Sequence, residues 1–122
     1  MTMTPDGGKA KPIANSTNKS VKIRALNDKF RKTMKGTDVY LSLEVASSVG
    51  DAALKHLLTS IRTYSNFIQK YAPNGDHSAG TVEVGMHRVE WSIDYWDKAE
   101  ENDSPDPANE ALTTRIMTIT RA

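Results

Sequence analysis

Apolar residues recur every three or four positions in two stretches of the chain, which is the spacing of one face of an α-helix. The first stretch covers residues 21–35, with Ser20 placed to cap its start and Gly36 placed to end it. The second begins at Asp51 and ends before Pro73. The sequence therefore predicts two amphipathic helices. Their apolar faces consist of Ile23, Leu26, Phe30 and Met34 in the first, and Leu54, Leu57, Leu58, Ile61, Tyr64, Ile68 and Tyr71 in the second.

Other stretches alternate between apolar and polar residues, which predicts half-buried strands. Residues 39–45, 81–84 and 87–95 follow this pattern. A last strand is predicted over residues 112–120, where isoleucine and threonine give a high β-branched content. Between the third and fourth strands, residues 97–109 are acidic and contain two prolines, which predicts an extended loop.

The loop between the second and third predicted strands fixes how these strands pair. Gly85 followed by Met86 suits a two-residue type II′ hairpin turn. Such a turn places Val82 opposite Val89, so that an apolar pair faces the core. An opposite-charge pair, Glu83 and Arg88, then faces outward, and Trp91 lies on the core side of its strand.

These elements predict an α+β fold in which two helices pack on a small, mainly antiparallel sheet, in the order α-β-α-β-β-β. A chain of 122 residues with 38% hydrophobic residues has room for one such domain, over residues 21–122. Residues 1–20 show no apolar period and are expected to form a disordered tail.

The amino-acid composition and the absence of common motifs exclude several kinds of functional site. The chain has no cysteine, which excludes disulfides, thiolate metal sites and a cysteine nucleophile. No apolar run approaches the roughly 20 residues that span a bilayer, so we expect no membrane contact and a cytoplasmic protein. The common phosphate-binding, dinucleotide and hydrolase motifs do not occur, and we expect neither a cofactor nor a bound metal.

Charge is segregated along the chain although the net charge is only +1. Residues 1–36 contain nine basic and two acidic side chains, whereas residues 74–111 contain ten acidic and two basic ones. The two segments either neutralise each other in the fold or present separate surfaces to separate partners. A basic surface attracts nucleic acid or an acidic protein. The candidate basic residues of the first helix are Lys22, Arg24, Lys29, Arg31, Lys32 and Lys35.

A second candidate group lies at the end of the long predicted strand. Asp94, Trp96 and Asp97 are grouped there as binding residues. Together with a histidine, the two carboxylates would also suit a small hydrolase or nuclease. His87 is seven positions from Asp94, which places it on the opposite face of the strand and about 23 Å away. We therefore rank catalysis below binding. His56 and His77 are expected to be surface residues.

Asn27, Asp28 and Arg31 interrupt the first helix with residues that are poor or average helix formers. Asn27 borders the apolar face, where it is expected to hydrogen-bond the acidic loop, and Arg31 is expected to pair with one of the loop's carboxylates. A role in binding a ligand is the alternative interpretation.

Several short motifs stand out along the chain: IRALND at 23–28 with FR at 30–31, GTVEV at 80–84, HRV at 87–89 with Trp91, IDY at 93–95 with Asp97, SPDPA at 104–108 and TRI at 114–116. With these motifs the chain resembles a bacterial family classed as a domain of unknown function, family 3768, which is found mainly in proteobacteria and often on mobile replicons. The resemblance implies a shared fold and no established activity.

The sequence thus favours a non-catalytic interaction module that binds a macromolecular partner, either a protein or a nucleic acid. The mobile-replicon setting that the resemblance implies makes host machinery a candidate target. The alternative is the hydrolase or nuclease that would use Asp94, Asp97 and a histidine.

Overall fold

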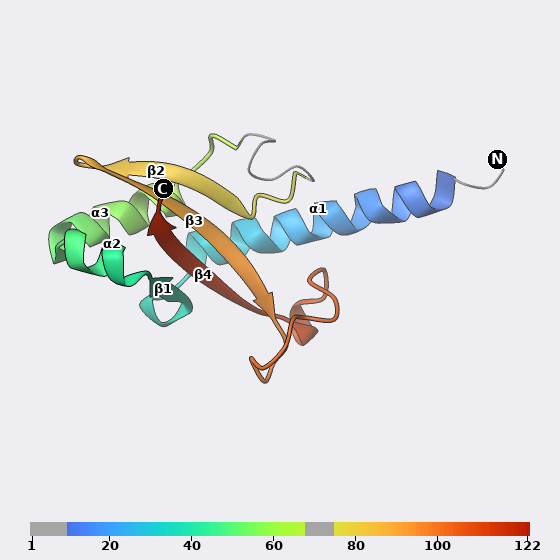
Figure 1. Ribbon diagram of the computed structural model, residues 1–122. Coiled ribbons are helices and arrows are strands. Elements are labelled where there is room, and N and C mark those ends of the chain that lie inside the picture. Colours follow the sequence, from blue (N-terminus) through green and yellow to red (C-terminus); the bar gives the residue numbers. More distant parts are fainter. Residues whose placement is uncertain (1–9, 68–74) are drawn as a thin grey trace.

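A computed structural model describes residues 10–67 and 75–122, with side chains described from Asn18 onward. Helices pack on a four-stranded sheet, and the longest helix extends well beyond the sheet (Figure 1). The sheet is mixed but mainly antiparallel, in the order β1-β4-β3-β2. The α+β class is therefore confirmed, and the main elements follow one another along the chain much as the sequence predicts.

Helix α1 covers Ala10–Thr33 and is longer than the sequence pattern predicts. It begins 11 residues before the expected start at residue 21, so residues 10–20 are helical where a disordered tail was expected. Pro12 does not prevent this extension, because it lies in the first turn, where its missing N–H has no helical partner to lose. Residues 1–9 lie outside the described part of the chain.

The predicted strand over residues 39–45 is wrong in its second half. After a 3₁₀ turn at Gly36–Asp38, β1 covers only Val39–Leu41, and a short helix α2 follows over Leu43–Ser48. Ser42 accepts a hydrogen bond from the backbone N–H of Val45 and so caps α2. Leu43 consequently faces solvent, whereas Val45 is buried.

Helix α3 covers Asp51–Arg62 and packs against β2 and α1. Leu57 and Ile61 on its predicted apolar face are fully buried. The helix ends about ten residues earlier than its pattern predicts, at Arg62, and Tyr64 lies beyond it. The expected helical residues Ile68 and Tyr71 lie outside the described residues.

Strands β2 (Ala79–Val84) and β3 (His87–Trp96) form the predicted hairpin. Val82 pairs with Val89 and Glu83 pairs with Arg88, as the turn chemistry indicates. Gly85 has a φ of +60°, which a type II′ turn requires at its first central position. The register of this hairpin is therefore confirmed.

Strand β4 (Thr114–Arg121) lies in the middle of the sheet, between β3 and β1. It follows a second 3₁₀ turn, η2, at Glu110–Leu112. It runs antiparallel to β3 over eight paired positions and parallel to β1, where Leu41 is opposite Ile119. The residue pairs place Trp91, Ile93, Met117 and Ile119 on the face that the helices cover.

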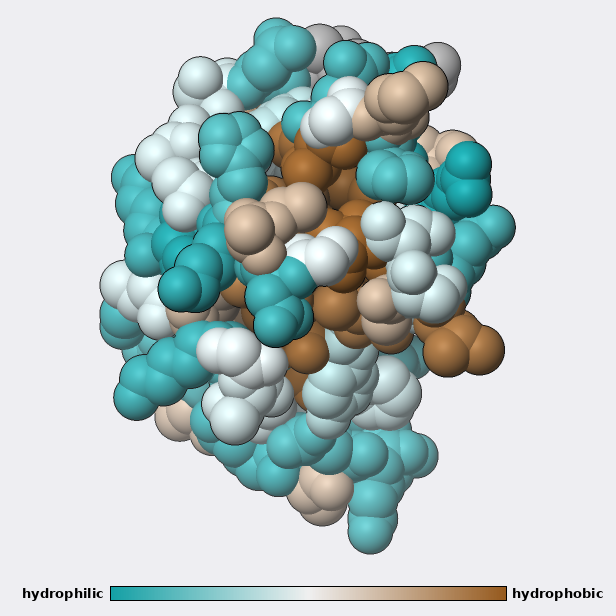
Figure 2. All heavy atoms as spheres, turned by 90° about the vertical axis from the view of Figure 1, so that its left-hand side faces the viewer, coloured by the Kyte–Doolittle hydropathy of each residue, from teal (hydrophilic) through white to brown (hydrophobic). Residues whose placement is uncertain are grey.

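The core fills the space between α1, α3 and this sheet face. Trp91 is fully buried, as predicted, and Tyr64 lies edge-on against it at a centroid distance of 5.4 Å. At the end of the molecule formed by α2, α3 and the hairpin turn, apolar atoms reach the surface and are rimmed by hydrophilic ones (Figure 2). Leu43 and Met86 are exposed, large apolar side chains in these elements.

Candidate functional site

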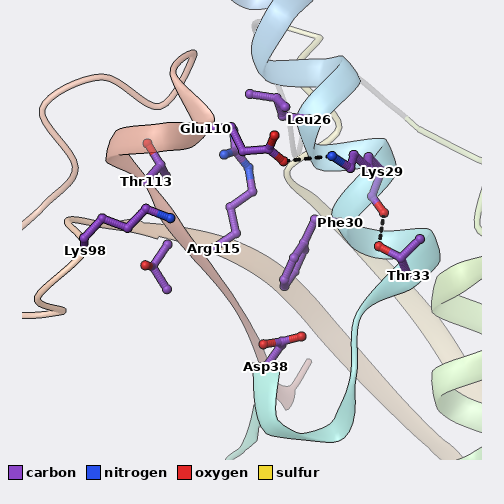
Figure 3. Close-up of a pocket in the computed structure, with 10 residues that line it drawn as sticks. Leu26, Lys29, Phe30, Thr33, Asp38, Lys98, Glu110, Thr113 and Arg115 are labelled. Atoms are coloured by element: carbon purple, nitrogen blue, oxygen red, sulfur yellow. Dashed lines mark hydrogen bonds and ion pairs between the residues drawn. The ribbon is translucent and has the colours of Figure 1, made fainter.

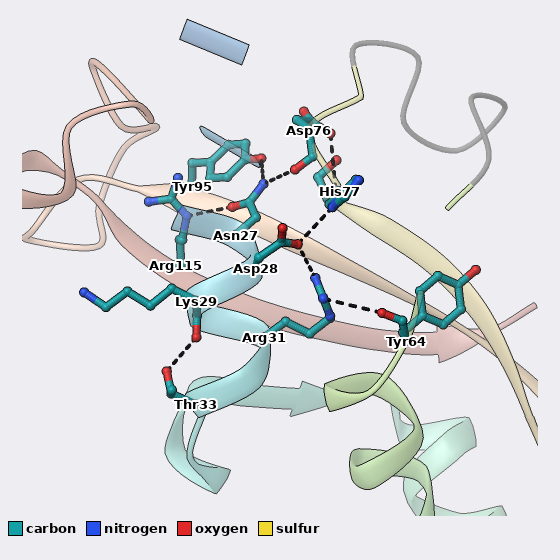
Figure 4. A network of polar contacts seen from close by, with 11 residues as sticks. Asn27, Asp28, Lys29, Arg31, Thr33, Tyr64, Asp76, His77, Tyr95 and Arg115 are labelled. Atoms are coloured by element: carbon teal, nitrogen blue, oxygen red, sulfur yellow. Dashed lines mark hydrogen bonds and ion pairs between the residues drawn. The ribbon is translucent and has the colours of Figure 1, made fainter. Parts of the chain in front are cut away.

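Asn27 lies at the centre of a polar network that joins α1 to the sheet (Figure 4). Its side chain is fully buried and makes three hydrogen bonds, which engage both amide protons and the amide oxygen. Nδ2 donates to the Tyr95 hydroxyl at 2.8 Å and to the Asp76 carbonyl at 2.9 Å, while Oδ1 accepts from Nε of Arg115 at 2.7 Å. A buried amide with every partner in place fixes the position of α1 against β3, β4 and the segment before β2.

Arg115 is the basic member of this network and is only 8% exposed. Besides its bond to Asn27, it donates from Nη2 to the carbonyl of Pro107 at 2.6 Å, and its guanidinium lies over the Tyr95 ring. Burial lowers the pKa of Arg115, and the nearby charges of Tyr95 and Glu110 oppose this effect. No carboxylate of the described residues forms an ion pair with Arg115.

The acidic loop is held in place for this contact by Thr113. Its buried hydroxyl lies 2.7 Å from the Ser104 hydroxyl and donates to the carbonyls of Asp106 and Asn109. Asn109 in turn caps the 3₁₀ turn η2. These bonds turn the loop so that the Pro107 carbonyl faces Arg115.

A second polar group lies on the adjacent side of α1. Arg31, only 2% exposed, donates to Asp28 at 2.8 Å and to the Tyr64 carbonyl at 3.4 Å, and His77 lies 2.9 Å from the same Asp28 oxygen. Burial alone would raise the pKa of Asp28, but the hydrogen bonds from Arg31 and His77 lower it overall. The His77 ring also stacks on Phe67 at 3.8 Å, so this histidine is half-buried rather than a surface residue.

A pocket of about 290 Å³ opens between α1, the acidic loop and the start of β4 (Figure 3). Its polar lining includes Lys29, Lys98, Glu110 and Arg115, and Asp38 lies at the end away from Glu110. Lys29 and Glu110 form an ion pair of 3.0 Å across the rim. Their side chains are 64% and 61% exposed, so this pair contributes little to stability.

The six candidate basic residues have different surroundings in the structure, and one of them, Lys35, lies beyond the end of α1 at Thr33. Lys22, Lys32 and Lys35 are exposed, and none of them forms an ion pair with a described residue. Lys29 is exposed but paired with Glu110, and Arg24 is half-buried. Arg31 is buried against Asp28 of its own helix, and not against the acidic loop as expected.

The second candidate group, Asp94, Trp96 and Asp97, does not converge on one point. Asp94 accepts a hydrogen bond from the Thr118 hydroxyl on the sheet face opposite the core residues. Half-buried Trp96 pairs with Thr114 and bridges to Asp103. Asp97 accepts backbone N–H bonds within its own turn, chiefly from Glu101, and these bonds lower its pKa.

No histidine joins these carboxylates in the described residues. His87 lies at the opposite end of β3, paired with Val84 beside the hairpin turn, and His56 is exposed on α3. Within residues 10–67 and 75–122, no three side chains of the His, Asp and Glu types lie close enough to hold a metal ion. The geometry therefore gives the hydrolase interpretation no assembled site among these residues.

Sequence reasoning found part of the polar network and missed its partners. The odd placement of Asn27 and Asp28 inside a helix marked these residues as anchors, but Asn27 bonds Tyr95, Asp76 and Arg115 and not the acidic loop as expected. Their partners Tyr95, Asp76, His77 and Arg115 lie 49 to 88 positions away. Nothing local in the sequence connects residues so far apart. The Asp28–Arg31 pair, in contrast, follows from its i,i+3 spacing on a helix.

The fold defines an α+β domain with helices on one face of a mixed sheet, and the part of the chain that the structure describes contains no helix able to cross a membrane. Residues 43–122 match the family described as "Protein of unknown function (DUF3768)", and the chain belongs to that family. The motifs at 23–31 lie before the matched residues. No curated protein and no solved structure matches the chain.

Proposed function

We propose that the protein is a non-catalytic interaction module that binds a macromolecular partner, either a nucleic acid or an acidic protein, through the basic face of α1. The basic face consists of the exposed residues Lys22, Lys29 and Lys32 of α1 and of Lys35, which lies just beyond the end of the helix at Thr33. Steps of seven and three positions separate the three helical lysines, which places them along one side of the helix. The observation that supports the proposal best is that Lys22, Lys32 and Lys35 pair with no described carboxylate.

The shape of the molecule supports the same proposal. α1 has 24 residues and is therefore about 36 Å long, and its N-terminal half extends away from the sheet (Figure 1). Lys22, the first residue of the basic face, directly follows this projecting half, whereas Lys29 and Lys32 lie in the half nearer the sheet. Exposed lysines attract phosphates through counterion release, with an affinity that falls as the salt concentration rises.

The alternative is that the acidic segment neutralises the basic face within the protein and leaves it unable to bind a partner. The structure shows one such contact among the described residues. Of the basic face, only Lys29 pairs with a loop carboxylate, that of Glu110. This pair is exposed, so a partner can displace it at small cost. None of the acidic residues in the loop itself forms an ion pair with a described residue, and Glu100, Glu101 and Asp103 among them are exposed.

We further propose that this binding takes place in a bacterial cytoplasm, where a protein encoded on a mobile element acts on host machinery. The argument for this setting is the motif resemblance described above, which is an analogy at the level of the family. It names no particular host target.

The test is a titration of fluorescently labelled DNA and RNA, followed by anisotropy at low and at moderate salt. We expect binding at low salt that weakens steeply as salt rises, and we expect both Lys22→Glu and Lys32→Glu to weaken it. Lys55→Glu is the matched control, because Lys55 is exposed on α3 and carries the same charge. Absence of binding at low salt would remove nucleic acid and leave an acidic protein as the partner. Equal effects of all three reversals would contradict a role of the basic face.

A further inference from the structure

Arg115 is a buried cation that forms no ion pair with a described carboxylate, although Glu110 lies nearby in the same pocket. Removing a guanidinium from water is costly unless a carboxylate or another anion compensates it. The partners of Arg115, the Asn27 amide and the Pro107 carbonyl, are both neutral. Two of its nitrogens, Nε and Nη2, are used in these bonds, whereas Nη1 donates to no described residue. The segment 68–74 contains no acidic residue in the sequence.

The pocket beside Arg115 places two further cations near this buried charge. Lys29 and Lys98 line the pocket with Arg115, from α1 and from the acidic loop respectively (Figure 3). Lys98 is exposed and forms no ion pair with a described residue. Three cations from three segments of the chain thus surround a space of about 290 Å³.

Glu110 occupies the part of the pocket where an anion would be stabilised. Its carboxylate binds Lys29 at 3.0 Å and lies close enough to Arg115 to influence its ionisation. Figure 3 shows the Glu110 side chain between Lys29 and the Arg115 guanidinium. Because Glu110 is 61% exposed, it is free to move out into solvent when a stronger anion arrives.

We propose that this pocket binds a small phosphate monoester, whose phosphate group displaces the Glu110 carboxylate and lies against Arg115, Lys29 and Lys98. A phosphate monoester carries nearly two negative charges at neutral pH and three acceptor oxygens, which matches three cationic donors better than a single carboxylate does. Arg115 supplies the directional contact and the two lysines supply charge.

The rest of the pocket indicates what the phosphate is attached to. Phe30 and Leu26 form an apolar wall, and Asp38 lies beyond Phe30 from Glu110. One Asp38 oxygen accepts the backbone N–H of Lys35, and the other accepts from no described donor. A carboxylate in this position suits a ligand hydroxyl, so the ligand class is a phosphorylated polyol or sugar. This inference concerns a small ligand and stands apart from the macromolecule that the basic face is proposed to bind.

The test uses the full chain, labelled with ¹⁵N, and follows NMR signals during titration with inorganic phosphate, glycerol 3-phosphate and succinate at matched ionic strength. We expect the Arg115 Nε–H signal and the Thr114 amide signal to shift with both phosphates, with glycerol 3-phosphate binding more tightly. Saturable shifts with succinate alone would overturn the proposal in favour of a dicarboxylate. Shifts spread over all exposed lysines, without saturation, would overturn it in favour of non-specific attraction.

Two variants at exposed positions test the arrangement without disturbing the core. Lys98→Ala should weaken glycerol 3-phosphate binding about threefold to fivefold, and Glu110→Gln should strengthen it by a similar factor, because the internal competitor loses its charge. Lys55→Ala, on α3, is the control and should leave the affinity unchanged. Weaker binding by Glu110→Gln, or equal effects of Lys98→Ala and Lys55→Ala, would contradict the site. These measurements contain no nucleic acid or partner protein, so their outcome is independent of the basic-face titration.

Discussion

Nε of Arg115 donates a 2.7 Å hydrogen bond to Oδ1 of Asn27, and this bond joins residues 88 positions apart in the chain. Arg115 lies in β4, within the part of the chain that matches the family, whereas Asn27 lies in α1, which precedes the matched residues. Tyr95 and Asp76, the other partners of Asn27, also lie in the matched part. The side chain of Asn27 therefore joins α1, by hydrogen bonds, to the part of the chain that matches the family.

Replacing Asn27 with alanine should destabilise the domain by about 2–4 kcal/mol, because the Tyr95 hydroxyl, the Asp76 carbonyl and Nε of Arg115 would all lose a buried partner. Urea denaturation measures this loss as a lower unfolding midpoint. Asn18→Ala is the control, since Asn18 is exposed on the same helix, and it should change stability by less than about 0.5 kcal/mol. Similar midpoints for the two variants would show that the network contributes little.

Trp91→Ala should cost about 3–5 kcal/mol, the usual range for removing a buried large aromatic side chain. Trp91 is fully buried and contacts Tyr64 edge-on, so its loss leaves a large cavity under the sheet. Trp96→Ala is a matched comparison, because Trp96 is only half-buried, and it should cost clearly less. Thermal unfolding followed by circular dichroism compares the two. A Trp91→Ala protein that melts like the parent would mean that this face of β3 is not the core face.

Gly80→Ala should destabilise by about 1–3 kcal/mol through overpacking. A Cβ atom at position 80 would lie 2.8 Å from both Nε1 of Trp91 and Cζ of Tyr64, which is closer than real side chains approach. Gly36→Ala serves as the control, since nothing lies within 4 Å of a Cβ at that position. Chemical denaturation should show a loss for the first variant and nearly unchanged stability for the second. A neutral Gly80→Ala would show that Tyr64 moves away at no cost.

Asp28→Asn should lower stability near pH 5 and should lose this effect as the solution becomes more acidic. Contacts with Arg31 and His77 hold the pKa of Asp28 below its ordinary value of 3.8, despite the opposing effect of burial. A lowered pKa means that the charged form stabilises the fold above the ordinary pKa, and this contribution disappears as pH falls through the folded-state pKa. Urea denaturation of parent and variant between pH 5 and pH 2.5 should show their midpoints converging. A constant difference across this range would rule out the Asp28 charge as its source.

Local patterns in the sequence predict the parts of this fold that local interactions decide. The hairpin of β2 and β3 has its predicted register because the turn residues and the alternation of both strands act over a few positions. Leu57 and Ile61 are buried as the helical spacing indicates. Trp91 lies in the core because the hairpin turn and the alternation of β3 place it on the inward face of that strand.

The errors occur where one pattern is compatible with two structures. Residues 39–45 alternate like a strand, but Ser42 caps the short helix α2. Val45 is therefore buried as a residue of this helix and not of a strand. The second helical pattern continues beyond Arg62, but the chain turns there, and Tyr64 reaches Trp91 from outside the helix. For the candidate site, sequence could mark Asn27 as unusual but could not supply Arg115 as its partner, because tertiary packing alone brings them together.

The position of β4 affects how this domain can fold during synthesis. The ribosome releases β1, α3 and the hairpin before it releases residues 114–121, yet those residues form the strand between β1 and β3. Until they emerge, β1 has no strand to pair with, and one edge of β3 is unpaired. Exposed strand edges of this kind invite pairing with other chains. The nascent protein is therefore expected to need protection from aggregation until residues 114–121 have emerged and β4 can pair.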